Sequence, residues 1–160
     1  MSESVPQARS AALRLIKFRP RSESELKNRL AEKGFTDTAV RTVIEDLRKT
    51  GLVGDARFAR YFAAQQAASK PVGRRLLLSR LRSKGIDPGL AEEAVQQATE
   101  GKDELERARE AASRRAPSLE GLPREAVKRR LFGYLSRRGF SSEIVYKVVK
   151  ETVHSSTSSE

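Results

Sequence analysis

The chain repeats one pattern three times, and each copy is anchored on a glycine. The three segments read LAEKGF at Leu30–Phe35, LRSKGI at Leu81–Ile86 and LSRRGF at Leu135–Phe140, with anchors 51 and 54 residues apart. A repeat of this length is typical of tandem helical units, each of which buries its apolar face against its neighbours. Matching apolar columns flank the anchors: Leu26, Leu77 and Leu131; Leu30, Leu81 and Leu135; Phe35, Ile86 and Phe140; Val43, Ala94 and Val148; Ile44, Val95 and Val149.

Each copy predicts a helix, a tight turn and a second helix. A basic residue precedes each anchor, and both a cation in the last turn and a glycine just after it suit a helix end. N-cap residues follow two positions later, at Thr36, Asp87 and Ser141. A third helix is expected before each pair, over residues 8–18, 55–68 and 102–115, with Asp55 as the N-cap of the second of these.

These elements predict an all-α protein of three tandem three-helix repeats that form an elongated, curved molecule. We place the repeats at residues 8–51, 52–101 and 102–153, between a disordered N-terminus at 1–7 and a disordered, Ser-rich tail at 154–160.

The composition offers little for catalysis. The chain has no Cys, so disulfides, thiol chemistry and Cys-based zinc sites are excluded, and its single histidine, His154, falls in the polar tail. Acidic pairs such as Glu92–Glu93 lie on amphipathic helices without a partner that completes a metal set. We therefore expect no enzyme activity, no metal and no cofactor. The absence of a membrane-length apolar run and of a signal peptide predicts a cytoplasmic protein with no membrane partner.

Charge is the most informative bulk property, because Lys and Arg outnumber Asp and Glu by 32 to 21, for a net charge of +11. The excess is spread evenly, at +4, +3 and +4 over residues 1–51, 52–101 and 102–160. A basic surface attracts polyanions, and evenly basic modules suit a long anionic track better than one compact site.

Two stretches concentrate the basic residues. Residues 70–86 contain no acid, and residues 122–140 contain only Glu125. On a helix Arg75 and Arg82 share one face, as do Arg130 and Arg137, and arginine suits bidentate binding of phosphate or carboxylate. A solvated basic face is the alternative interpretation. Five phenylalanines fall on apolar helical positions that favour core packing over base stacking: Phe35, Phe58, Phe62, Phe132 and Phe140. The candidate binding residues are Lys70, Arg74, Arg75, Arg82, Lys84, Arg129, Arg130, Arg137 and Arg138.

The motifs resemble the RecX family of bacterial recombination regulators over roughly residues 8–152. The resemblance depends on RPRSESELKNRLAEKGF at Arg19–Phe35, GLVGDARFARYF at Gly51–Phe62, VGRRLLLSRLRSKGI at Val72–Ile86 and the final LSRRGF. The family pattern usually has an acidic residue or Asn where this chain has Gly54, and often has Trp near Tyr61.

The resemblance implies a monomeric, non-enzymatic regulator of the same three-repeat fold. Proteins of this family bind the RecA filament on DNA along its groove, inhibit strand exchange and ATP hydrolysis, and bind single- or double-stranded DNA with little sequence preference. Two alternatives stay open from the residues alone. One is a helix-turn-helix transcription regulator, although the second helices offer few base-reading side chains. The other is a helical adaptor that binds protein only.

Overall fold

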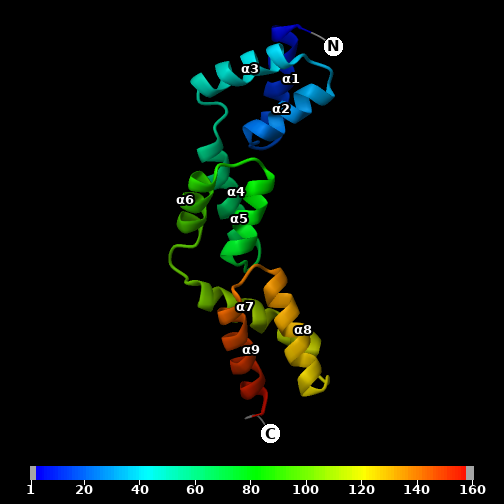
Figure 1. The fold of residues 1–160 in the computed structure, drawn as a ribbon, viewed down its shortest axis with the longest axis vertical. Helices are drawn as coiled ribbons and strands as arrows, with labels where there is room; N and C mark the ends of the chain where they lie inside the picture. The colour runs from blue at the N-terminus through cyan, green and yellow to red at the C-terminus, as the bar shows by residue number, and fades with distance from the viewer. Residues whose placement is uncertain (1–2, 158–160) are drawn as a thin grey trace. The chain divides into compact units, whose positions relative to one another are not determined.

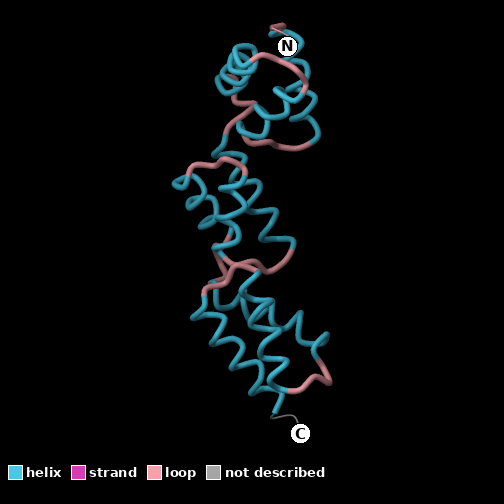
Figure 2. The backbone as a smooth tube through the Cα atoms, turned by 45° about the vertical axis from the view of Figure 1, so that its right-hand side comes forward, coloured by secondary structure: helices cyan, strands magenta, loops and turns pink. Residues whose placement is uncertain are grey.

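The computed structural model describes residues 3–157, and within them it contains nine α-helices, one short 3-10 helix and no β-strand (Figure 1). The all-α prediction is confirmed. Helices account for most of the backbone and are joined by short loops (Figure 2). The helices are α1 Val5–Phe18, α2 Glu23–Glu32 and α3 Asp37–Lys49 in repeat 1; α4 Asp55–Ser69, α5 Arg74–Ser83 and α6 Pro88–Ala98 in repeat 2; and α7 Glu104–Arg115, η1 Ala116–Leu119, α8 Arg124–Arg137 and α9 Ser142–Thr157 in repeat 3.

Both outer helices extend beyond the predicted repeat boundaries. Helix α1 begins at Val5, because the Ser4 side chain accepts a hydrogen bond from the amide of Gln7 and Val5 packs on the core of repeat 1. Helix α9 continues to Thr157, since Val153 is buried and the next serine hydroxyls donate to carbonyls one turn back. The prediction of disorder is therefore wrong for residues 5–7 and 154–157. Residues 1–2 and 158–160 lie outside the described part of the chain.

The predicted glycine turns are present in all three repeats. Gly34, Gly85 and Gly139 have φ of 94°, 79° and 90°, in the left-handed region that favours glycine. After the first of these turns, Thr36 caps α3 by accepting a hydrogen bond from the amide of Ala39. Asp55 behaves differently from its prediction, because it is the first residue of α4 and its carboxylate accepts a 2.9 Å hydrogen bond from the amide of Glu23. It therefore caps α2, 32 residues earlier in the chain.

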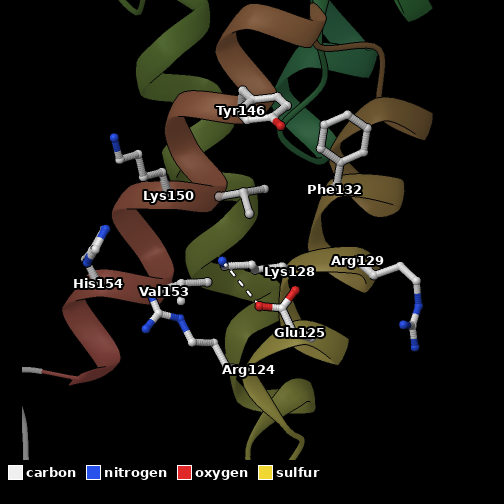
Figure 3. A pocket seen from close by; sticks show the side chains of 10 residues that line it. Arg124, Glu125, Lys128, Arg129, Phe132, Tyr146, Lys150, Val153 and His154 are labelled. Atoms are coloured by element: carbon white, nitrogen blue, oxygen red, sulfur yellow. Dashed lines mark hydrogen bonds and ion pairs between the residues drawn. The ribbon is translucent and has the colours of Figure 1, made fainter.

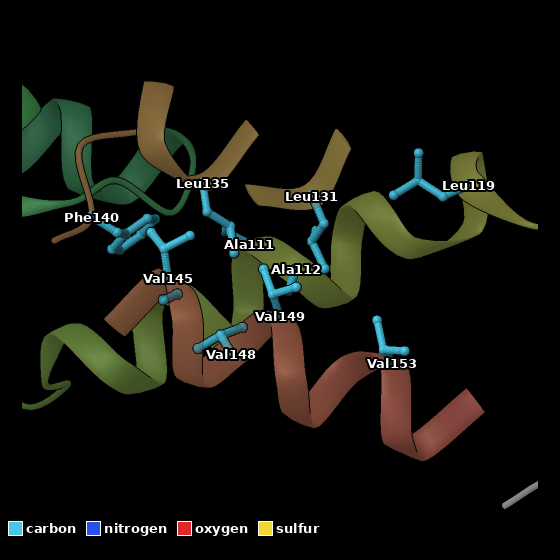
Figure 4. Close-up of a cluster of buried hydrophobic side chains, with 11 residues drawn as sticks. Ala111, Ala112, Leu119, Leu131, Leu135, Phe140, Val145, Val148, Val149 and Val153 are labelled. Carbon is cyan, nitrogen blue, oxygen red and sulfur yellow. The ribbon is translucent and has the colours of Figure 1, made fainter. Parts of the chain in front are cut away.

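The repeated apolar columns form the cores. Every member of the two leucine columns has an exposed fraction of 0%. In repeat 1, α1, α2 and α3 enclose one cluster of alanines, leucines and valines. In repeat 3, α7, α8 and α9 enclose a second cluster, in which Leu131 and Leu135 of α8 face Val145, Val148 and Val149 of α9 (Figure 4). Burial of this kind contributes about 1.5–3 kcal/mol per large aliphatic side chain.

The chain divides into two compact units, and the division passes through all three helices of repeat 2. One unit comprises the residues up to Phe62 together with Leu81–Ala94, and the other comprises Ala63–Arg80 together with the residues from Val95 onward. The units are described separately below. None of the helices in the described residues is both long and apolar enough to span a membrane.

Within the second unit, the start of α5 lies directly against the turn between α8 and α9. The amide of Gly73 donates to the carbonyl of Arg138 at 2.7 Å, and the amide of Arg75 donates to the carbonyl of Gly139 at 3.2 Å. A methyl group on Gly73 would lie 2.5 Å from the amide nitrogen of Phe140 and closer still to the backbone of Gly139. Two backbones thus meet with no room for a side chain between them.

Candidate functional site

Most of the predicted binding residues are exposed on two helices. Arg74 and Arg75 begin α5 and Arg82 lies near its end, while Arg129, Arg130 and Arg137 lie on α8; all six are exposed, as is Lys70 in the loop before α5. Among the described residues, Arg75, Arg82, Arg129, Arg130 and Arg137 form no ion pair. Some exposed arginines elsewhere are paired, since Arg48 and Arg109 each hold a glutamate through two hydrogen bonds.

Arg138 has a structural contact of its own. Its side chain is half-buried, and its Nε and Nη2 both donate to the carbonyl oxygen of Pro71, at 3.1 and 2.9 Å. The guanidinium therefore fastens the α8–α9 turn to the loop before α5, next to the close backbone contact of Gly73. This use of the guanidinium separates Arg138 from the exposed arginines of α8.

A second arginine that the sequence analysis did not single out holds the same loop. Arg107 of α7 is only 8% exposed; its Nε donates to the carbonyl of Val72 at 3.2 Å and its Nη1 to the carbonyl of Lys102 at 2.7 Å. Burial lowers the pKa of Arg107, although the nearby carboxylates of Glu104 and Asp103 oppose the shift. The sequence does contain one indication that Arg107 is buried, because this residue lies beside Ala108 and one turn before Ala111 on the apolar face of α7.

Lys84 also lies near a carboxylate. It is half-buried, and its charge helps to lower the pKa of Glu25. Burial opposes that shift, and the hydrogen bond and charge of Arg19, with the charge of Arg21, outweigh it. Of the nine candidates, Arg138 is engaged in hydrogen bonds inside the molecule and Lys84 is half-buried, whereas the other seven are exposed.

A cluster of three charged residues in the first unit, Glu23, Arg48 and Asp55, is built around Glu23. Arg48 donates to both carboxylate oxygens of Glu23, at 2.7 and 2.8 Å, and this hydrogen bonding is the main cause of the lowered pKa of Glu23. Burial raises the pKa of the adjacent Asp55, although the amide of Glu23 donates to its carboxylate. The group joins α2, α3 and α4, so its role is to hold these helices together.

A groove of about 740 Å³ lies between α8 and α9 in repeat 3 (Figure 3). The rings of Phe132 and Tyr146 face one another at one end, 5.9 Å apart and edge-to-face. Tyr146 is 72% exposed and Phe132 is 37% exposed, so the prediction that Phe132 belongs to the core is wrong. Tyr146 could not be identified from the sequence, because it lies one turn before the buried Val149 on the same helix and so shares its apolar spacing.

The other two tyrosines are less available. Tyr61 is 41% exposed, and Tyr134 is half-buried with the guanidinium of Arg115 5.3 Å from its ring centre. Such a cation over a ring stabilises by about 0.5–1 kcal/mol at an exposed site. Neither of these tyrosines contributes to the exposed aromatic pair of the groove.

No group of three or more His, Cys, Asp or Glu side chains in the described part of the chain is placed to hold a metal ion. What the described surface offers is cations, one aromatic pair and helix faces, which are means of binding. Together the fold and surface define a class: a basic protein of tandem three-helix repeats.

Comparison with known proteins identifies the family within this class. The first, second and third three-helix domains of RecX match residues 8–47, 55–95 and 102–149. The chain is 32% identical to "Regulatory protein RecX" of Amycolatopsis mediterranei over 149 residues, which cover 93% of this chain and 85% of that protein. It is 34% identical to the protein of the same description from Syntrophotalea carbinolica, over 89% of this chain and 94% of that protein. The chain belongs to the RecX family, whose members are regulatory proteins and not enzymes.

Solved structures show the same fold. The crystal structure of RecX from Lactobacillus salivarius matches with a TM-score of 0.78 at 20% identity, covering 92% of this chain and 95% of that one. A second RecX crystal structure matches with a TM-score of 0.81 at 23% identity, covering 92% of this chain and 73% of that one. The predicted fold of three tandem three-helix domains is thus confirmed.

Proposed function

We propose that this chain regulates the RecA recombinase in the cytoplasm, by binding as a monomer along the groove of the RecA filament on DNA. Binding there inhibits strand exchange and ATP hydrolysis, and the chain also binds single- or double-stranded DNA with little sequence preference. The proposal depends on the family membership together with the exposed cations of α5 and α8.

The observation that carries the proposal is that five arginines of α5 and α8 are exposed and form no ion pair within the described residues. They are Arg75, Arg82, Arg129, Arg130 and Arg137. An exposed arginine without a carboxylate partner keeps all of its donors for phosphate or for an acidic protein surface. Lys70 and Arg74 are exposed beside them and belong to the same proposed contact set. Contacts of this kind are salt-sensitive and weakly sequence-specific.

The test is the DNA-dependent ATPase of RecA, measured with increasing amounts of the full chain. We expect the wild type to lower the ATPase, and the double variant Arg75→Glu with Arg129→Glu to need at least about tenfold more protein, given about 1–3 kcal/mol for charge-assisted contacts. The matched control is Arg14→Glu with Arg60→Glu, which changes the net charge equally at two exposed positions on α1 and α4.

Two outcomes of this assay count against the proposal, and one further measurement checks the DNA contact. A wild type that leaves the ATPase unchanged at stoichiometric excess rejects the regulation of RecA. Equal losses in the test and control variants would mean that net charge, and not these positions, governs binding. Direct binding to random DNA at two salt concentrations, by fluorescence anisotropy, checks the DNA contact, since each lost phosphate contact lowers the salt dependence of the affinity.

A further inference from the structure

The α8–α9 groove has the features of a surface that is covered in a complex. In repeat 3, Phe132 and Tyr146 are the only large hydrophobic side chains of the described residues that are exposed, and both lie in this groove. Behind them Val149 and Val153 are 7% and 4% exposed and give the groove an aliphatic floor. Exposed apolar side chains gathered over an apolar floor and bordered by charges mark an interaction site.

The groove has the length and direction of a bound helix. Its residues recur every three or four positions, at Arg124, Lys128 and Phe132 on α8 and at Tyr146, Lys150 and His154 on α9. Eight residues on each helix correspond to about 12 Å, or roughly two turns. Two helices that present matching rows of side chains over that length accept a third helix along the channel between them.

The charge of the groove selects an acidic occupant. Four cations line it, Arg124, Lys128, Arg129 and Lys150, against one carboxylate, Glu125. That carboxylate is already paired with Lys128 at 3.5 Å, while the other three cations form no ion pair within the described residues. Arg129 and Lys150 project outward on opposite sides of the groove (Figure 3), so a helix between them meets a cation along each edge.

From these features we infer that the α8–α9 groove binds an acidic amphipathic helix of a protein partner. Its apolar stripe packs on Phe132, Tyr146 and Val149, and its flanking carboxylates pair with the cations at the two edges. If the proposed function holds, the partner that supplies this helix is the filament protein. Only this identification of the partner depends on the proposed function.

A single strand of nucleic acid fits this groove less well. Strand-binding grooves stack successive bases on several open aromatic faces. Here the only aromatic pair is edge-to-face, at an interplanar angle of 86°, so each ring hinders stacking on the other. The floor beyond them is aliphatic, which suits the leucine or phenylalanine side chains of a helix.

The experiment measures binding of a synthetic peptide to the full chain by fluorescence anisotropy. The probe is a labelled 16-residue helical peptide with leucines at helical spacing i, i+3, i+4 and i+7 and glutamates beside them. A scrambled peptide of the same composition lacks the stripe, and a labelled strand of 15 thymidines represents nucleic acid. The variants are Tyr146→Ala and Lys150→Glu in the groove, with Lys147→Glu as the matched control, because Lys147 is exposed on α9 and does not line the groove.

We expect the wild type to bind the amphipathic peptide at least about tenfold more tightly than the scrambled one. Tyr146→Ala and Lys150→Glu should each weaken that binding about tenfold, and Lys147→Glu should change it less than about twofold. Equal binding of both peptides, or equal losses with Lys150→Glu and Lys147→Glu, overturns the inference. Loss of thymidine binding in Tyr146→Ala with peptide binding intact overturns it in favour of nucleic acid.

The same variants in the RecA ATPase assay keep the two proposals apart. A wild type that binds the peptide and does not inhibit RecA rejects the proposed function and supports the groove. A wild type that inhibits RecA but does not distinguish the two peptides rejects the groove and supports the proposed function.

Discussion

Replacing Gly73 with alanine probes the closest backbone contact described in the second unit. The φ of Gly73 is not positive, so alanine introduces no left-handed strain there. The added methyl group would instead meet the backbone of Gly139 and lie 2.5 Å from the amide nitrogen of Phe140. Ordinary contact begins near 3.4 Å, so the two segments must separate by about an ångström. No side chain can rotate to relieve the clash, because the opposing atoms are main chain.

The cost follows from what the separation breaks. Two backbone hydrogen bonds cross this contact, from Gly73 to Arg138 at 2.7 Å and from Arg75 to Gly139 at 3.2 Å. Each contributes about 0.5–1.5 kcal/mol, and overpacking adds about 1–3 kcal/mol. The reduced freedom of the unfolded chain returns about 0.4–1 kcal/mol. The free energy of unfolding should therefore fall by about 1–5.5 kcal/mol, which lowers the melting temperature by roughly 2–22 °C for a chain of this size.

Urea denaturation followed by circular dichroism measures the change, with Gly54→Ala as the control. A methyl group on Gly54 meets nothing within 4 Å, and its φ is likewise not positive. The control should therefore lie within about 0.5 kcal/mol of the wild type, as surface substitutions usually do. If Gly73→Ala unfolds at the same urea concentration as Gly54→Ala, the close approach of the two backbones is refuted.

Two further substitutions test buried and paired charges. Arg107→Met keeps an apolar stem but leaves two backbone carbonyls without their donor, so urea denaturation should show a loss of about 2–3 kcal/mol; an unchanged midpoint would show that the guanidinium is dispensable. Glu23→Gln removes the ion pair with Arg48, which lowers the pKa of Glu23 from its ordinary 4.5. A lowered pKa stabilises the fold above pH 4.5, and the gain is lost as the pH falls through the lowered value. The variant should be less stable by about 0.5–1 kcal/mol at pH 7. The difference should shrink as the pH falls through the lowered pKa of Glu23, as thermal melts over a pH series would show; a constant difference would contradict the assignment.

The core could be predicted because its determinants are local and repeated. The leucine columns lie on helices whose spacing identifies the buried face, and comparison of three copies removes chance matches. The glycine turns were predictable for a similar reason, since a residue in the left-handed region after a helix is most often glycine. Both features depend on residues that are separated along the chain by less than the length of one helix.

The features that sequence reasoning missed depend on distant neighbours. Asp55 is a residue type that often caps its own helix, but the amide that donates to its carboxylate lies 32 residues earlier, at Glu23. Arg107 is buried because the carbonyl of Val72, 35 residues away, is placed to receive it. Tyr146 is exposed because its ring lies on the rim of the groove between α8 and α9, and only the packing of the two helices defines that groove. The periodicity of apolar residues along one helix carries no information about contacts with residues this far away in the chain.

The anchor glycines show how one residue type meets both a local and a distant requirement. Gly34 closes a helix, and a methyl group on it would meet nothing within 4 Å. Gly85 and Gly139 close helices in the same way, but a methyl group on Gly85 would lie 2.6 Å from Cβ of Ser24, and one on Gly139 would lie 2.9 Å from Cα of Leu76 and closer to its nitrogen. In both cases the atom that is met belongs to the second helix of the preceding repeat. The turn that ends a helix in repeats 2 and 3 is therefore also the surface by which that repeat packs on the one before it, and helix closure alone does not explain why these two positions are glycine.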